Sequence, residues 1–167
     1  MIHVRINTSI YATEDPERVM AALRKMFVFN QADVVEESRK ETVTLKIDPS
    51  IQYEVEATRI ILEFDSTTCL SKLKNKIRDN YIQDCARSIL YGSRVHLDGE
   101  MQRVSFKIHK QAAFMDVLHF SELHESPLGP INVDVTSDDI EGLINWLAPR
   151  GKDDTTSDED AARACKD

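Results

Sequence analysis

The sequence has few of the residues that build nucleotide-binding loops, metal sites or membrane spans. Five glycines occur among 167 residues, and none falls in a Gly-x-Gly or Gly-Lys-Ser/Thr pattern, which excludes the common phosphate-cradling loops. The five histidines and three cysteines lack Cys-x-x-Cys or His-x-x-x-His spacing, so no metal and no cofactor is predicted. No apolar run approaches the ~20 residues of a membrane helix, and no signal peptide is recognisable. We therefore expect a cytoplasmic protein.

Residues for catalysis are equally scarce. Two pairs of acids, Glu122 with Glu125 and Asp138 with Asp139, are expected to be exposed, and neither pair has an evident partner for general acid–base work. The chain shows no nucleophile paired with a base. We therefore expect no catalytic residues and no enzymatic activity.

Charge changes sign along the chain. The net charge is −8, yet the segment 66–94 holds six basic side chains against two acidic ones. Residues 1–65 have eight basic and twelve acidic side chains, and residues 95–149 have three and nine. A local cationic segment in an anionic body suits a protein that meets one polyanion without binding every polyanion. An ordinary solvated helix face has the same composition, so both interpretations stay open.

Hydrophobic spacing predicts the fold class. A strand is expected at the alternating residues Ile2, Val4 and Ile6, and a helix begins at Asp15 and Pro16 and ends near residue 29. Further strands are predicted at 33–37, 42–47, 53–64 (broken near residue 57), 103–110, 115–120 and 131–135. A last helix follows Ser137. The order lacks a regular strand–helix–strand rhythm, so we predict an α+β fold with a mainly antiparallel sheet and its helices packed on one face.

One long helix is predicted between Ser66 and Gly92. Its apolar positions recur every three or four residues, and Leu73, Ile77 and Tyr81 are expected to face the sheet. Residues 1–149 are expected to form a single domain. Residues 150–167 have no hydrophobic periodicity and are predicted to be a disordered polar tail.

Four short stretches together resemble a known family. They are residues 11–19 (YATEDPERV), 82–87 (IQDCAR), 110–114 (KQAAF) and 125–131 (ESPLGPI). In this order and spacing they resemble an uncharacterised archaeal protein family that has been assigned to RNA binding and loosely linked to the exosome. That family is similar in fold to the ribosomal protein that anchors 5S rRNA. The resemblance covers residues 2–149 and is specific as a set. It implies an α+β fold and an RNA-related role.

The cationic helix supplies the first candidate RNA-contacting residues. At 100° per residue, Lys72, Lys76 and Arg87 fall on one side of the predicted helix, away from Leu73 and Ile77. Ammonium and guanidinium groups in such a row neutralise phosphates. The alternative is a solvated face with no ligand.

The end of the strand at 103–110 supplies the second set. Lys107 and Lys110 are placed to reach phosphates there, and Gln111 to reach a base or sugar. The alternative is that Ala112 and Ala113 pack a tight strand-to-strand connection. The loop at 125–130, with Gly129 free to adopt positive φ, is either a recognition surface or a shaped connection.

These observations favour an RNA-binding or ribonucleoprotein-associated accessory factor without catalytic activity. Its partner would be RNA or a ribonucleoprotein complex. The alternative is a protein-interaction or self-associating module, such as a homodimer, with no direct RNA contact. The placement of five cations discriminates between the two, because direct RNA binding by all of them needs one shared surface: Lys72, Lys76, Arg87, Lys107 and Lys110.

Overall fold

A computed structural model describes residues 1–44, 47–121 and 128–150 of the chain. The strands in these residues are β1 (Ile2–Tyr11), β2 (Val35–Thr44), β3 (Gln52–Phe64), β4 (Val95–His96), β5 (Gln102–Ile108) and β6 (Ile131–Ser137). The α-helices are α1 (Pro16–Met26), α2 (Ser71–Asp79), α3 (Gln83–Gly92), α4 (Lys110–Phe114) and α5 (Ile140–Leu147), with short 3-10 helices at Gln31–Asp33 and Thr68–Leu70. Apart from Arg150, the predicted tail lies outside the described residues.

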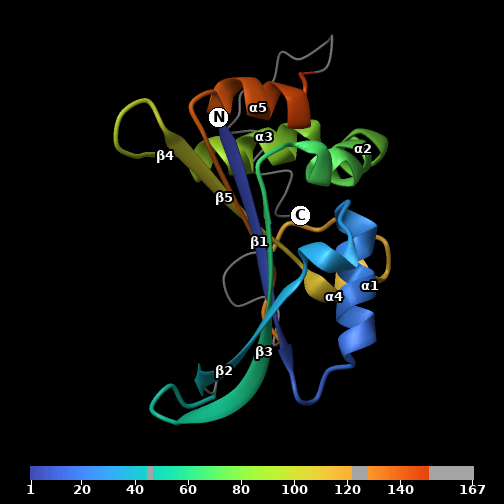
Figure 1. The fold of residues 1–167 in the computed structure, drawn as a ribbon, viewed down its shortest axis with the longest axis vertical. Helices are drawn as coiled ribbons and strands as arrows, with labels where there is room; N and C mark the ends of the chain where they lie inside the picture. Colours follow the sequence, from blue (N-terminus) through green and yellow to red (C-terminus); the bar gives the residue numbers. More distant parts are fainter. Residues whose placement is uncertain (45–46, 122–127, 151–167) are drawn as a thin grey trace.

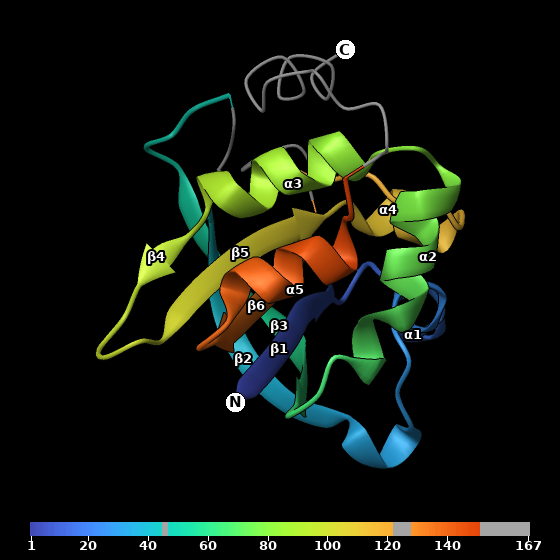
Figure 2. The ribbon, with the colours of Figure 1, turned by 90° about the horizontal axis from the view of Figure 1, so that it is seen from above.

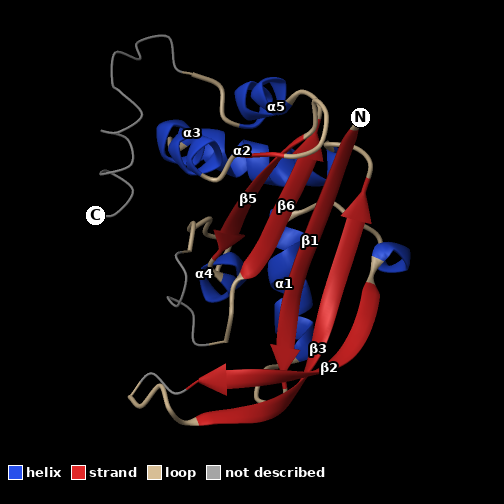
Figure 3. Cartoon of the chain, turned by 90° about the vertical axis from the view of Figure 1, so that its left-hand side faces the viewer, coloured by secondary structure: helices blue, strands red, loops and turns tan. Residues whose placement is uncertain are grey.

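The six strands form one sheet in the order β2-β3-β1-β6-β5-β4, and every pairing in the described ranges is antiparallel. β1 lies between β3 and β6, and Figure 3 shows it near the middle of the sheet. Its residue Val4 is paired with Phe64 on one side and with Val135 on the other. The structure thus confirms the predicted α+β class and the antiparallel sheet.

One face of the sheet carries the core. Along β1, every second residue from Val4 to Ile10 is buried, whereas Arg5 is exposed and Asn7 and Ser9 are partly exposed. Figure 1 shows α1, α2 and α4 on one side of the strands, and Figure 2 shows α3 and α5 lying along β5 and β6. Because β-strand side chains alternate between faces, burial of every second residue of β1 places these helices over one face.

β2 and β3 continue as a two-stranded ribbon beyond the rest of the sheet. β3 pairs with β1 from Ala57 to Phe64, and its first residues, Gln52 onward, pair with β2. Figure 3 shows the far end of this ribbon bending away from the other strands. The turn predicted at Asp48 is present, since the Ser50 amide donates to the Asp48 carboxylate at 3.0 Å.

The predicted long helix is wrong: the structure has two helices, α2 and α3, joined at Asn80, Tyr81 and Ile82. Tyr81 adopts a left-handed conformation with φ of 56° and its side chain is 88% exposed, so its predicted burial is also wrong. Leu73 and Ile77 are buried as expected. Periodicity missed the break because the apolar spacing continues through it.

Four other boundaries differ from the sequence prediction. The two strands expected at 33–37 and 42–47 are the single strand β2, and β3 is continuous through Ala57. The strand expected at 115–120 is reduced to an isolated bridge between Ile108 and Phe120, because α4 occupies the residues just before it. The end of the predicted strand 103–110 is the first residue of α4, with the His109 side chain accepting from the Ala112 amide.

Candidate nucleic-acid interface

The six candidate RNA-contacting residues do not share one surface. Lys72 and Lys76 lie on α2, whereas Lys107 lies on β5 among the side chains that face away from the buried Val104 and Phe106. Gln111 is exposed on α4. Arg87 and Lys110 are buried, at 2% and 4% exposed, so the expectation that they present charge to solvent is wrong.

Arg87 joins α3 to α5. Its Nη1 donates to Asn145 Oδ1 at 2.9 Å and to the Ala148 carbonyl at 3.0 Å. Its guanidinium carbon also lies 5.4 Å from the centre of the Tyr91 ring. Buried guanidinium donors are mostly paired, as Nη1 and Nη2 of Arg87 are, and a carbonyl at a helix end needs a donor. Arg87 therefore stabilises the end of α5 from inside the protein.

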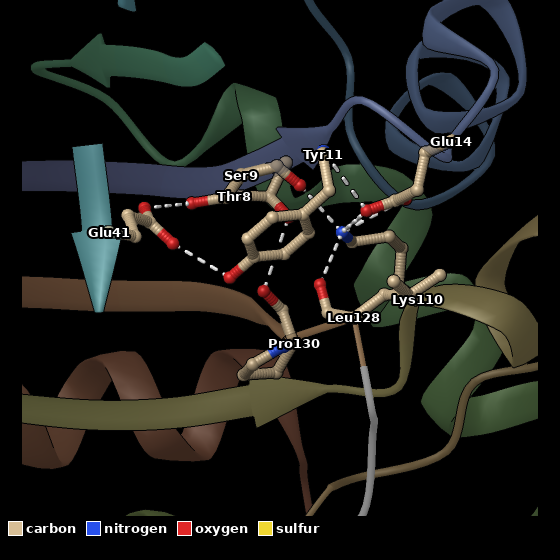
Figure 4. Close-up of polar contacts among 8 residues, drawn as sticks. All are labelled: Thr8, Ser9, Tyr11, Glu14, Glu41, Lys110, Leu128 and Pro130. Atoms are coloured by element: carbon tan, nitrogen blue, oxygen red, sulfur yellow. Dashed lines mark hydrogen bonds and ion pairs between the residues drawn. The ribbon is translucent and has the colours of Figure 1, made fainter. Parts of the chain in front are cut away.

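Lys110 is the centre of a second buried network, drawn in Figure 4. Its Nζ lies 3.0 Å from Glu14 Oε1, and the two side chains are 4% and 7% exposed. The same nitrogen donates to the carbonyls of Ser9, at 2.6 Å, and Leu128, at 2.9 Å. Burial lowers the pKa of Lys110, and the bond to Glu14 opposes that shift. With three acceptor groups around it, the ammonium group is occupied by the protein itself.

Tyr11 links this network to Glu41 on β2, which is separated from β1 by β3 in the sheet (Figure 4). Its hydroxyl donates to Glu41 Oε2 at 2.7 Å, and Ser9 Oγ donates to the other carboxylate oxygen of Glu41 at 2.7 Å. Burial, followed by the bond to Glu41, raises the pKa of Tyr11 to about 12. Burial alone would raise the pKa of Glu41, but the bonds from Ser9 and Tyr11 lower it. Thr8 Oγ1 also donates to the Pro130 carbonyl at 3.2 Å.

The stretches that carried the family resemblance meet in these two networks. Tyr11 and Glu14 come from the first stretch, Lys110 from the third, and Leu128 belongs to the fourth. Arg87 comes from the second stretch. Within the fourth stretch, Gly129 adopts φ of 79°, as its residue type predicted, and residues 125–127 lie outside the described residues. The described residues of these stretches therefore hold distant parts of the fold together.

An open cleft lies between α1 and α2 and has a volume of about 590 Å³. Basic side chains from both helices line it together with two carboxylates: Arg24, Lys25, Lys72, Lys76, Asp79 and Asp116. We call this set the cationic cleft. Positions 72, 76 and 79 fall on one face of α2 because they are four and three residues apart. Four cations against two acids give the cleft a net positive charge on a protein of net charge −8.

The ammonium groups of the cleft are held by oxygen atoms of the protein. Lys72 Nζ donates to the Arg24 carbonyl at 2.6 Å, near the end of α1. Lys25 Nζ donates to the Phe114 carbonyl at 2.5 Å. Lys76 is paired with Asp116 at 2.5 Å, and the bond from Lys76 lowers the pKa of that carboxyl. A phosphate oxygen can replace the Asp116 carboxylate, which is 62% exposed, because such an ion pair is worth little in water.

Sequence reasoning found Lys72 and Lys76 but missed Arg24 and Lys25. Both missed residues lie in the last turn of α1. A cation is stabilised there by the partial negative charge at the end of a helix, and this local effect alone explains their positions. Their place beside α2 depends on helix packing between segments about fifty residues apart, as the 48-residue separation of Arg24 and Lys72 shows. The sequence around α1 therefore gave no reason to group Arg24 and Lys25 with Lys72 and Lys76.

The described part of the chain holds no group of three or more His, Cys, Asp or Glu side chains placed to bind a metal ion. Among its helices, none has the length and apolar character needed to cross a bilayer.

Comparison with known proteins identifies relatives over most of the chain. A family model described as RNA binding matches residues 3–136. A UPF0201 protein of Metallosphaera sedula is 32% identical over 151 residues, which is 90% of this chain and 90% of the relative. A UPF0201 protein of Pyrobaculum calidifontis is 35% identical over 150 residues, 89% of this chain and 90% of the relative.

Solved structures with a similar fold cover most of the chain. The crystal structure of a UPF0201 protein from Methanococcus jannaschii superposes with a TM-score of 0.61 at 22% identity, covering 88% of this chain and 99% of that one. A second UPF0201 crystal structure gives a TM-score of 0.58 at 22% identity, covering 93% and 99%. The fold is therefore shared with these proteins, and the sequence relatives are archaeal. The chain belongs to the UPF0201 family, whose members it matches over most of their length, and to the RNA-binding family that the model describes.

Proposed function

We propose that this protein binds RNA directly and that the cationic cleft is where it contacts phosphates. The observation that carries the proposal is the convergence of Arg24 and Lys25 with Lys72 and Lys76 around one open cleft. Four cations in one place attract a polyanion, whereas the overall charge of −8 disfavours binding elsewhere on the surface. The match of residues 3–136 to an RNA-binding family model supports the same function.

The proposal is for a binding function rather than a catalytic one, with a structured RNA or a ribonucleoprotein complex as the partner. The sequence resemblance to the family linked to the exosome, and through it to the fold of the 5S-rRNA-binding ribosomal protein, supports that choice of partner. Lys107 and Gln111 lie on other surfaces and are left out of the proposed contact.

A second candidate function is self-association through the ribbon of β2 and β3. Ile47, Ile51 and Tyr53 are 98%, 47% and 46% exposed near its far end. Two-stranded ribbons are only marginally stable in water, so apolar side chains at such a tip favour a protein partner. The experiment below distinguishes the two functions.

The test is binding of a labelled stem-loop RNA, followed by fluorescence anisotropy across a salt series. The variant is the Lys72→Gln, Lys76→Gln double substitution in the cleft. If each lysine neutralises one phosphate, the slope of log K against log salt should fall by about 1.4–1.8 in magnitude. The matched control is Lys40→Gln with Arg103→Gln, which removes the same charge from exposed positions on β2 and β5.

A slope that falls equally in the cleft variant and the control would refute the cleft as the binding site. Absence of wild-type binding at low salt, together with a dimer in sedimentation that Tyr53→Ser or Ile51→Ser disrupts, would establish the second function instead.

A further inference from the structure

Tyr81 is a large aromatic residue in a place where the fold does not need one. It adopts φ of 56° between α2 and α3, and its side chain is 88% exposed. The amide of Tyr81 donates to the Arg78 carbonyl at 3.2 Å, and the amide of Ile82 donates to the Ile77 carbonyl at 3.1 Å. These bonds close the end of α2 by means of the backbone, where Gly or Asn is the usual residue.

The Tyr81 backbone is therefore strained, and its exposed ring adds nothing to the core. A left-handed conformation in a residue other than glycine costs free energy, and such residues cluster at functional sites. The second such residue in the described ranges is Asp116, with φ of 62°, which is the partner of Lys76 in the cationic cleft. Both unusual backbone positions are thus associated with α2 and the cleft.

Tyr81 follows closely after the cleft-lining face of α2. That face ends at Asp79, two residues before Tyr81. With consecutive Cα atoms about 3.8 Å apart, the Cα atoms of Asp79 and Tyr81 can be separated by at most about 7.6 Å. An exposed aromatic ring thus stands just beyond the end of α2 whose cleft-lining face carries Lys72 and Lys76, the cations proposed to bind phosphates. Aromatic rings beside cationic grooves hold the bases of single-stranded nucleic acids by stacking.

We propose that the protein recognises unpaired RNA nucleotides, with the backbone in the cationic cleft and a base stacked on Tyr81. This inference rests on the proposed function and names the kind of RNA that it concerns. A paired duplex keeps its bases stacked inside, so only a loop, bulge or single strand can offer a base to the ring. The ring has no hydrogen-bond pattern to read beyond its single hydroxyl, so stacking tolerates every base.

The experiment compares two labelled probes by fluorescence anisotropy: a single-stranded 12-nucleotide oligouridine, and a fully paired duplex of the same length closed by a short non-nucleotide linker. The variant is Tyr81→Asn, because Asn tolerates the left-handed conformation and removes the ring. It should weaken binding of the oligouridine about 5- to 150-fold, the range found for loss of one stacked base. Binding of the duplex and the salt slope of both probes should stay unchanged.

Two controls make the result specific. Tyr81→Phe keeps the ring and should bind the oligouridine like the wild type, whereas Tyr53→Asn removes an exposed ring from the distant ribbon and should change nothing. Melting curves should show that all variants stay folded, with Tyr81→Asn at least as stable as the wild type because Asn tolerates the left-handed conformation.

Three outcomes would overturn this inference. One is oligouridine affinity that survives Tyr81→Asn, and another is an equal loss of duplex affinity in that variant. The third is a Tyr81→Phe variant as weak as Tyr81→Asn. If the Lys72→Gln, Lys76→Gln variant still lowers the salt slope in any of these cases, the proposed function stands and only base stacking fails. If the wild type binds neither probe, both fail.

Discussion

Replacing Lys110 by methionine tests whether its buried network stabilises the fold. Methionine keeps an unbranched chain of similar length but removes the ammonium group. The Glu14 carboxylate, 7% exposed, would then lose its cation, and the carbonyls of Ser9 and Leu128 would lose their donor. Removing one partner of a buried ion pair costs about 3–5 kcal/mol, because the other charge stays buried. With a urea m-value of about 2 kcal/mol/M, the unfolding midpoint should fall by about 1.5–2.5 M.

The assay is urea unfolding followed by circular dichroism. Adding Glu14→Gln to Lys110→Met removes the unpaired buried charge of Glu14 and should restore about 1–3 kcal/mol of the free energy of unfolding. The effects of the two substitutions should therefore be strongly non-additive. The matched control is Lys76→Met, which breaks the ion pair with Asp116. That carboxylate is 62% exposed, so the control should cost less than about 1 kcal/mol.

A loss below about 1 kcal/mol in Lys110→Met, or a simple sum of the two effects in the double variant, would refute this reasoning. The network would then be an incidental arrangement of polar groups. The four stretches that carry the family resemblance would need another explanation.

Three further predictions concern the other buried groups. Arg87→Met should destabilise the protein by about 2–4 kcal/mol, measured by urea unfolding, because Asn145 and the Ala148 carbonyl lose their donor. Ile77→Ala should cost about 2–5 kcal/mol in the same assay, since Ile77 is fully buried and leaves a cavity. Tyr11 keeps its proton in the folded state up to a pKa of about 12, against 10.0 for a free tyrosine, so the folded state holds more protons between these values. Stability should therefore fall as pH rises through that window, and urea midpoints of Tyr11→Phe should show a smaller fall.

The sheet was predictable because its signals are local. Alternation along Ile2, Val4 and Ile6 gave β1, and Asp15 followed by Pro16 gave the start of α1, where Asp15 indeed accepts from the Glu17 amide at 3.0 Å. The break between α2 and α3 was not predictable in this way. It depends on Tyr81 adopting a conformation that glycine or asparagine would have indicated, and nothing in the residue type announces it.

That break also explains why Arg87 was expected on the wrong surface. The prediction placed Arg87 beside Lys72 and Lys76 by counting 100° per residue through a continuous helix. A change of helix direction at Tyr81 invalidates the count, and Arg87 faces α5 instead. For Lys110, the sequence shows a charge but not its burial, because its partners Glu14 and Ser9 are 96 and 101 positions away. Pairing over such distances is visible only in the folded protein.

The central position of β1 has a consequence for synthesis on the ribosome. Among the strands of this sheet, β1 is the first to be made and its neighbour β6 is the last, and the paired residues Asn7 and Asn132 are 125 positions apart. At about 5–20 residues per second, translation separates the two strands by about 6–25 s. During that time the edge of β1 that will meet β6 has no partner from its own chain, and an unpaired edge is open to other strands. A nascent chain that stalls before Ile131 would therefore carry a half-finished sheet, and its fate would depend on how soon a chaperone covers that edge.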